Sequence, residues 1–249
     1  MSSTKAIVLA AGKGSRLHSQ EQVLPKVLRQ ANGKSLLDYV LQATSFIPQK
    51  DTVLVVGYKG AMVRDHVKGA YRFVEQAQQL GTGHAVKATE VELQDYHGPI
   101  LVVYGDMPLF SPETYQALIR IHHESQAAAT LLTAVLEDPP DYGRILRDTD
   151  NKIVDIREVR DCTVEELLIE ELNSGVYVFD SQKLFEVLHE LKNDNVQGEF
   201  YLTDVPKLLL AQGETIASYT LIESDEVYGV NTLEELHFVE GLLRKRGIQ

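Results

Sequence analysis

Cysteine is nearly absent from the sequence. The 249 residues include one cysteine, Cys162, so no intrachain disulfide can form and nothing indicates an oxidising compartment. The residues around Cys162 match no motif of a cysteine nucleophile. Catalysis by a cysteine nucleophile therefore has no support.

Long hydrophobic runs are also missing. The N-terminal segment MSSTKAIVLAAGKG contains an apolar run of only six residues before its glycines. Such a run is too short for the core of a signal peptide or for a membrane span. We therefore expect a cytoplasmic protein.

Positive charge is scarce overall but locally concentrated. The 24 Lys and Arg residues are outnumbered by 36 Asp and Glu, which gives a formal net charge of -12. This balance disfavours binding to nucleic acid or to an anionic membrane, because the long-range field repels polyanions. Residues 1–34, however, carry six Lys and Arg against one Glu, a local charge of +5, and leave -17 for the rest. A small anion is expected to bind near this N-terminal segment.

Two nucleotide-binding motifs begin in the sequence without being completed. Gly12 and Gly14 start a G-x-G, but Leu17 replaces the third glycine of the dinucleotide fingerprint. The GKS at Gly33 resembles the end of a P-loop, yet Leu28 stands where the first glycine is required, so Asn32-Gly33 is interpreted as a turn before a helix.

With both motifs rejected, the N-terminal segment still contains a glycine loop that follows a predicted buried strand. Lys13, Arg16 and Lys26 lie in or shortly after this loop, and such a loop suits a polyphosphate better than a neutral ligand. Motifs for other chemistry are missing: HELKN at His189 lacks the second histidine of a zinc hydrolase, and no G-x-S-x-G elbow occurs.

Strand and helix patterns alternate along the chain. Continuous apolar runs predict buried strands, and amphipathic stretches with capping residues predict helices between them. Predicted strands cover 5–12, 51–58, 71–75, 99–106, 128–136, 172–180 and 215–221, and predicted helices cover 35–46, 60–68, 82–94, 111–125, 181–191, 198–213 and 232–247. Residues 143–159 form two short runs around a turn and predict a β-hairpin.

This alternation predicts an α/β fold, a doubly wound, mostly parallel sheet flanked by helices and Rossmann-like, with the hairpin as an insertion in the second half. No linker or repeat marks a second domain, so we expect a single domain over 1–249. Its expected parts are a nucleotide-binding half at about 1–110, a second half at about 111–230 and a C-terminal helix at 231–247.

Four glycine-rich or polar segments follow predicted strands. Because ligands bind outside the carboxyl ends of parallel strands, these segments predict one cleft. They are the Gly12 loop, QAQQLGTGHA at 76–85, GDMPL at 105–109 and YGVN at 228–231. Asp106 is either a turn-capping residue or a Mg2+ ligand, and Asn231 is either a second oxygen ligand or a helix N-cap.

Seven motifs together resemble one family. LAAGKGSR with LPK, QAQQLGTGHA, YGDMPL, YGRI, ELNSGVYVF, QGEFYLTD and GVN occur in this order over nearly the whole chain. They are similar to motifs of nucleotidyltransferases that act on sugar 1-phosphates, in particular the uridyltransferase domain of the bacterial enzyme that makes UDP-N-acetylglucosamine.

The resemblance implies roles for specific residues. Arg16, Lys26 and Asp106 are implied in catalysis, with Arg16 and Lys26 on the phosphates. Asp106 and Asn231 resemble the family's pair of Mg2+ ligands. The implied nucleotide-binding residues are Leu9, Ala10, Ala11, Gly12, Gly14 and Lys26, with Gln76, Gly81 and Thr82 reading the uracil. The implied sugar-binding residues are Tyr104, Gly143, Glu158, Asn173 and Thr203.

The implied reaction needs no protein nucleophile. A phosphate oxygen of N-acetylglucosamine 1-phosphate attacks the α-phosphorus of UTP in line, and pyrophosphate leaves. The protein positions two anions and neutralises their charge with Mg2+, Arg16 and Lys26. The expected partners are UTP and the sugar 1-phosphate alone, without nucleic acid or membrane.

The sequence departs from the family in two places. The segment LHSQEQVLP between Arg16 and Lys26 is longer than in relatives, and the chain stops after LLRKRGIQ, where bifunctional relatives continue into a hexapeptide-repeat acetyltransferase domain. No acetyltransfer is expected from these residues. Two alternatives remain: a uridylyl- or thymidylyltransferase for another hexose 1-phosphate, and a noncatalytic nucleotide-sugar sensor.

Overall fold

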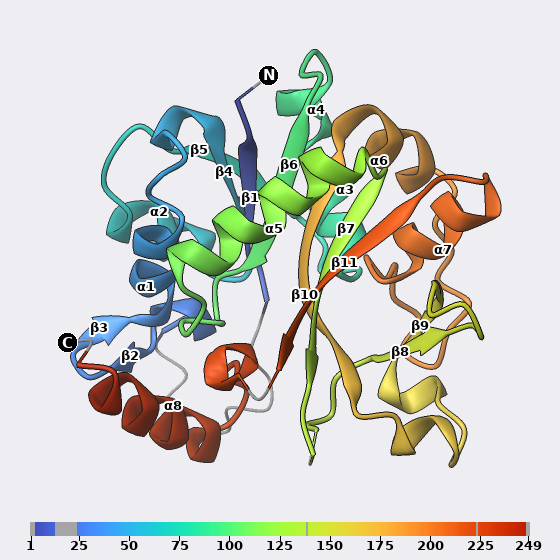
Figure 1. The fold of residues 1–249 in the computed structure, drawn as a ribbon. Coiled ribbons are helices and arrows are strands. Elements are labelled where there is room, and N and C mark those ends of the chain that lie inside the picture. Colours follow the sequence, from blue (N-terminus) through green and yellow to red (C-terminus); the bar gives the residue numbers. More distant parts are fainter. Residues whose placement is uncertain (1–2, 13–23, 138, 223, 248–249) are drawn as a thin grey trace.

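The computed structural model describes residues 3–12, 24–137, 139–222 and 224–247 (Figure 1). Strands and helices alternate along most of this chain, as the sequence predicts. The strands are β1 (Lys5–Ala10), β2 (Gln30–Ala31), β3 (Lys34–Ser35), β4 (Thr52–Val56), β5 (Arg72–Glu75), β6 (Pro99–Tyr104), β7 (Ala129–Val135), β8 (Arg144–Arg147), β9 (Ile153–Arg157), β10 (Glu171–Asp180) and β11 (Ile216–Ile222). The helices are α1 (Leu36–Ala43), α2 (Gly60–His66), α3 (Thr82–Lys87), α4 (Glu90–Leu93), α5 (Pro112–Ser125), α6 (Ser181–Leu188), α7 (Asp204–Ala211) and α8 (Leu233–Lys245).

One large mixed sheet forms the centre of the molecule. Its strand order is β11-β7-β10-β6-β1-β4-β5. Strand β10 runs antiparallel to both of its neighbours, β6 and β7, whereas the pairs β1–β6, β1–β4, β4–β5 and β7–β11 are parallel. The predicted fold class, a mostly parallel sheet flanked by helices, is confirmed.

Helices cover both faces of this sheet (Figure 1). Alternate residues of the central strands belong to two separate core clusters, because successive side chains of a strand point to opposite faces. Ile7 and Leu9 pack in the cluster that includes residues of α3, α6 and α7, whereas Ala6 and Val8 pack with residues of α1, α2 and α5. Burial on both faces explains why β1, β4 and β6 are almost continuous apolar runs.

Two smaller substructures attach to the central sheet. The predicted hairpin at 143–159 is formed by β8 and β9, and β8 pairs with β10 at Arg144 and Leu172. Helix α8 packs against the β2–β3 hairpin in a third apolar cluster. The Asn32 side chain donates a hydrogen bond to the carbonyl of Glu240 in α8 at 3.1 Å.

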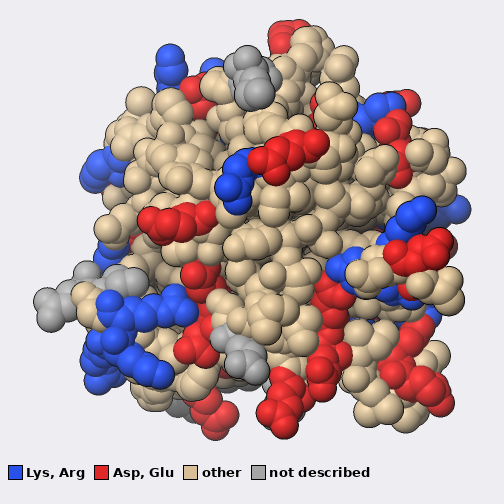
Figure 2. All heavy atoms as spheres, viewed as in Figure 1, with Lys and Arg blue, Asp and Glu red and all other residues tan. Residues whose placement is uncertain are grey.

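Charge is unevenly distributed on the face shown in Figure 2. Lys and Arg side chains gather at its lower left, where Figure 1 places the end of α8 beside β2 and β3, and acidic side chains occur along the lower edge and across the centre. Among the described helices, none is long and apolar enough to cross a bilayer.

Capping residues begin several helices where the sequence predicts them. The Ser35 side chain accepts a hydrogen bond from the Asp38 amide at the start of α1, and Ser111 caps α5 with Pro112 in its first turn. The Asn32-Gly33 turn is also observed, with positive φ at both residues, and it joins β2 to β3.

Two predicted helices are shorter than expected. The stretch 82–94 is divided into α3 and α4, and Ala88 and Thr89 lie between them. The stretch 198–213 is helical only from Asp204. Its preceding residues, Glu199 and Phe200, instead form part of a loop in which the Phe200 amide donates to the Leu80 carbonyl at 2.8 Å and the Phe200 carbonyl accepts from Gly83 at 2.8 Å. These long-range backbone bonds replace the helical ones.

A buried histidine makes stability depend on pH. His122 of α5 is 5% exposed, its Nδ1 lies 3.0 Å from Thr130 Oγ1, and burial, followed by repulsion from His123, lowers its pKa to about 4. The unfolded chain keeps a pKa near 6.5, so it binds a proton at pH 5 that the folded protein does not. Between pH 7 and pH 5 this group should therefore lower the free energy of unfolding by about 2 kcal/mol.

Urea unfolding at pH 7 and pH 5 tests this expectation. In His122→Gln the free energy of unfolding should fall by about 2 kcal/mol less between pH 7 and pH 5 than in the wild type. His237→Gln, at an exposed position of α8, should keep the wild-type pH dependence. An unchanged pH dependence in His122→Gln would contradict it.

Candidate active site

The site lies at the carboxyl ends of the central strands. Strand β1 lies between β4 and β6 in the sheet. After β1 the chain continues to β4 on one side, and it later returns to β6 on the other side, so the end of β1 is the point where the strand order reverses. A cavity of about 580 Å3 opens there. Residues from separate segments line it, among them Leu9, Ala11, Gly12, Lys26, Gln76, Gly81, Thr82, Tyr104, Asp106 and Asn231. All ten are residues to which the sequence assigns a role.

A second cavity of about 220 Å3 adjoins the first. Its lining includes the other four predicted sugar-binding residues, Gly143, Glu158, Asn173 and Thr203. Tyr104, Asp106 and Asn231 line both cavities, so the two meet at these side chains.

One described residue among those predicted lies away from both cavities, and two predicted residues are not described. Ala10 is 2% exposed and packs in the core beside Leu54 and Val56, because it ends β1 with its side chain on the face away from the cavity. Gly14 and Arg16 lie outside the described residues.

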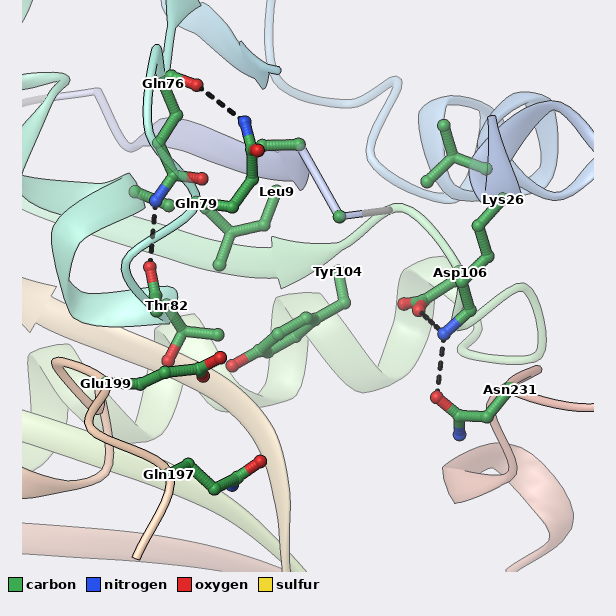
Figure 3. A pocket seen from close by; sticks show the side chains of 15 residues that line it. Leu9, Lys26, Gln76, Gln79, Thr82, Tyr104, Asp106, Gln197, Glu199 and Asn231 are labelled. Carbon is green, nitrogen blue, oxygen red and sulfur yellow. Dashed lines mark hydrogen bonds and ion pairs between the residues drawn. The ribbon is translucent and has the colours of Figure 1, made fainter. Parts of the chain in front are cut away.

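Lys26 connects Asp106 with Asn231 (Figure 3). Its Nζ donates to Asn231 Oδ1 at 2.7 Å and forms an ion pair with Asp106 Oδ2. The Lys26 side chain is 11% exposed and that of Asp106 21%. The buried neighbours Val27 and Leu28 anchor the backbone of Lys26, so its ammonium group is held at the junction of the two cavities.

Asp106 and Asn231 are also tied together through the backbone. Asp106 lies just beyond the end of β6, and its carbonyl accepts from the Val230 amide at 3.0 Å. The alternative that Asn231 is the N-cap of the last helix is wrong. Thr232 is the N-cap of α8, and it forms a capping box with Glu235.

The donor set at this junction fits a magnesium ion. One carboxylate oxygen and one amide oxygen both contact the same Lys26 nitrogen, so they converge on one point. Mg2+ is commonly bound through one or two protein oxygens, with phosphates and waters completing its coordination. Among the described residues, no cluster of three or more His, Cys, Asp or Glu forms a metal site. The fit therefore depends on the Asp106–Asn231 pair together with ligand oxygens.

The far end of the larger cavity is built around Gln76. This side chain is 3% exposed, and its Nε2 donates to the Gly81 carbonyl at 3.0 Å. Gly81 has φ of +110°, and an added Cβ would lie 2.5 Å from the Phe200 carbonyl oxygen. Only glycine fits here without strain, because the loop passes close to the backbone of Phe200.

The smaller cavity contains a carboxyl group held by a hydroxyl. Thr203 Oγ1 donates to Glu158 Oε1 at 3.0 Å, and burial raises the pKa of Glu158 despite this bond. Asn173 Nδ2 donates to the Tyr177 hydroxyl at 2.6 Å. A carboxyl group and an amide on one wall can bind hydroxyl and amide groups of a sugar.

Tyr104 forms part of the wall that both cavities share. Burial strongly raises the pKa of its hydroxyl, so it stays protonated, and Thr82 is its hydrogen-bond partner. Gly175, at φ +81°, lets the ring approach closely, since a Cβ there would lie 2.9 Å from Tyr104 Cε2.

Sequence reasoning missed several residues of the site. Gln79, Gln197 and Glu199 line the larger cavity, and the Tyr142 hydroxyl accepts from the Gly229 amide at 2.9 Å next to the smaller one. All four lie within or next to the motifs noted in the sequence. The incorrect helix prediction for 198–213 hid Glu199, and Gln197 directly precedes that stretch.

Comparison with known proteins gives consistent results. The chain is 44% identical over 246 residues to the bifunctional protein GlmU of Levilactobacillus brevis, covering 99% of this chain and 53% of that protein. It is 43% identical over 246 residues to the protein of the same name from Listeria monocytogenes serotype 4a, with the same coverage. The chain thus spans about half the length of these relatives.

Solved structures show the same fold. UDP-glucose pyrophosphorylase complexed with UDP-glucose matches with a TM-score of 0.78 at 17% identity, covering 98% of this chain and 100% of that one. The apo-UDP-glucose pyrophosphorylase structure matches with a TM-score of 0.79 at 18% identity, covering 98% and 99%. Finally, residues 6–203 match the family described as the MobA-like NTP transferase domain. The resemblance that the sequence motifs indicate is therefore confirmed, and the chain belongs to the MobA-like NTP transferase family.

Proposed function

We propose that this protein transfers a uridylyl group from UTP to N-acetylglucosamine 1-phosphate, giving UDP-N-acetylglucosamine and pyrophosphate. The observation that carries the proposal is the meeting of two cavities at Tyr104, Asp106 and Asn231, with the Lys26 ammonium group bonded to the last two. A transfer between two phosphorylated substrates requires adjoining sites with cationic groups where the phosphates meet. The similarity to GlmU proteins over 99% of the chain supports the choice of substrates.

In this proposal the half at about 1–110 binds the nucleotide and the half at about 111–230 binds the sugar. Gln76, Gly81 and Thr82 contact the uracil, and the backbone at Leu9, Ala11 and Gly12 follows the ribose and phosphates. Glycine at position 12 keeps side-chain atoms away from the phosphates. Lys26, and Arg16 from outside the described residues, neutralise the triphosphate.

The sugar 1-phosphate occupies the smaller cavity. Gly143, Glu158, Asn173 and Thr203 contact its hydroxyl and acetamido groups, and Tyr104 separates the sugar from the base. This arrangement brings the phosphate of the sugar to the Lys26 side of the cleft, where an oxygen attacks the α-phosphorus in line and the P–O bond to pyrophosphate breaks.

Charge neutralisation is the main catalytic requirement, because both reactants are anions. Asp106 and Asn231 would hold Mg2+, which neutralises phosphate charge when bound. Lys26, which bonds the same two oxygens, would supply a further cationic group to the phosphates beside them. No side chain needs to form a covalent intermediate.

Pyrophosphate release tests the function. Purified protein with Mg2+ should release pyrophosphate fastest with UTP and N-acetylglucosamine 1-phosphate, and more slowly with glucose 1-phosphate or with other nucleoside triphosphates. Release with another pair only would keep the mechanism and replace the substrate. Tight binding of nucleotide sugar without release from any pair would contradict the proposal and favour a sensor.

A further inference from the structure

The Gln76 amide uses both of its N–H groups inside the protein. One donates to the Gly81 carbonyl at 3.0 Å, and Nε2 also lies 3.0 Å from Nδ1 of His84 on α3. The amide oxygen is drawn in Figure 3 on the opposite side, turned toward the Leu9 side of the cavity. In this orientation Gln76 offers the ligand an acceptor and no donor.

The partners of Gln76 determine this orientation. Were the amide reversed, its oxygen would face the carbonyl oxygen of Gly81, and two acceptors would repel each other. With Nε2 toward His84, Nδ1 must accept, so the imidazole has to be neutral with its proton on Nε2. Burial and the nearby Lys87 lower the pKa of His84, which keeps the ring neutral at neutral pH.

We propose that His84 is a positioning residue that sets the base preference of the nucleotide site by holding the Gln76 amide with its oxygen toward the ligand. This inference rests on the proposed function, in which Gln76 reads the base. A uracil carries an N–H at ring position 3 and can donate to that oxygen, whereas cytosine has a lone pair there and meets a second acceptor. The site therefore favours UTP over CTP, although the two bases have nearly the same shape.

The expected change in the preference for UTP over CTP follows from the hydrogen bond that His84 makes with Gln76. Without an acceptor at position 84, one Gln76 N–H loses its buried partner and the amide is held by Gly81 alone. The amide then rotates more easily, and its donor can turn toward the ligand. We expect the preference for UTP over CTP to fall by about tenfold, mainly through weaker binding of UTP.

A pair of variants with nearly equal shape provides the test. His84→Leu removes the acceptor, whereas His84→Asn places an amide oxygen near the position of Nδ1. His189→Leu is the matched control, because His189 pairs with Glu90 outside the cavity lining and its side chain is 53% exposed. The dissociation constants of UTP and CTP are measured by calorimetry, and kcat/KM is measured for both nucleotides.

The expected result is a UTP/CTP ratio that falls about tenfold in His84→Leu, recovers most of that loss in His84→Asn and is unchanged in His189→Leu. A folded His84→Leu variant that keeps the wild-type ratio, or that weakens UTP and CTP equally, would overturn the inference while leaving the proposed function intact. Wild-type protein that binds neither nucleotide would overturn both. If His84→Leu does not fold, a wild-type ratio in His84→Ala would likewise overturn the inference.

Discussion

Lys26→Ala should lower turnover by about 100- to 1000-fold while leaving the protein folded. The Lys26 ammonium group contacts Asp106 and Asn231, which line both cavities, and in the proposed reaction the phosphates of both substrates meet there. Removing one preorganised charge contact of this kind corresponds to a loss of about 2.7–4 kcal/mol of transition-state stabilisation. The fold should survive, since Val27 and Leu28 remain buried and keep the local backbone in place.

The control for this variant is Lys34→Ala. Lys34 belongs to the same cation-rich N-terminal segment, but its ammonium group contacts Gln42 and the Tyr39 ring outside the cavities. Circular dichroism and pyrophosphate release are measured for both variants. A Lys26→Ala variant with near-normal turnover would refute the role assigned to Lys26.

The same variant has a second readout without substrates. In the nucleotide-free protein Lys26 competes for the oxygens that a metal ion needs, because it bonds both Asp106 and Asn231. Lys26→Ala should therefore bind Mn2+ more tightly than the wild type when no nucleotide is present, as measured by electron paramagnetic resonance. A general disruption of the site would weaken binding instead.

Asp106→Asn should raise the Mg2+ concentration needed for half-maximal turnover and should lower turnover at limiting Mg2+ by about 100-fold. The amide keeps an oxygen near the position of the carboxylate but removes its negative charge, so attraction to a divalent cation decreases. Added Mg2+ should restore part of the activity of Asp106→Asn but not that of Asp106→Ala, which has no oxygen to offer.

Turnover measured over a range of Mg2+ concentrations provides the test. Asp95→Asn is a suitable control, since Asp95 is an exposed carboxylate outside the residues that line the two cavities. An unchanged Mg2+ dependence in Asp106→Asn would show that Asp106 is not a metal ligand.

The buried strands and most helix starts follow from local sequence. Residues 6–10 (AIVLA) and 99–103 (PILVV) include no polar side chain that could face water, so these runs are expected between two layers of helices. Ser35 and Ser111 begin helices because their side chains satisfy backbone amides within three residues. These are short-range effects, and they can be predicted without knowing the rest of the chain.

Long-range contacts account for the errors. The segment before α7 has helical composition, but its backbone bonds to residues 80–83 and becomes a wall of the larger cavity. Position 231 suited both a cap and a ligand, but Thr232 caps α8, and the Asn231 side chain accepts instead from Lys26, 205 residues away in the sequence. Local propensity contains no information on such partners.

The sequence by itself therefore determined the α/β class, the buried strands and the chemical inventory of the site, since each depends on residue type and near neighbours. Only the tertiary structure decided which of these groups touch. It paired Lys26 with Asp106 and Asn231, placed His84 behind Gln76 and joined the two cavities at Tyr104. The physical reason is that hydrogen bonds and ion pairs act over a few ångströms in space, whereas their partners here are separated by up to 205 residues along the chain.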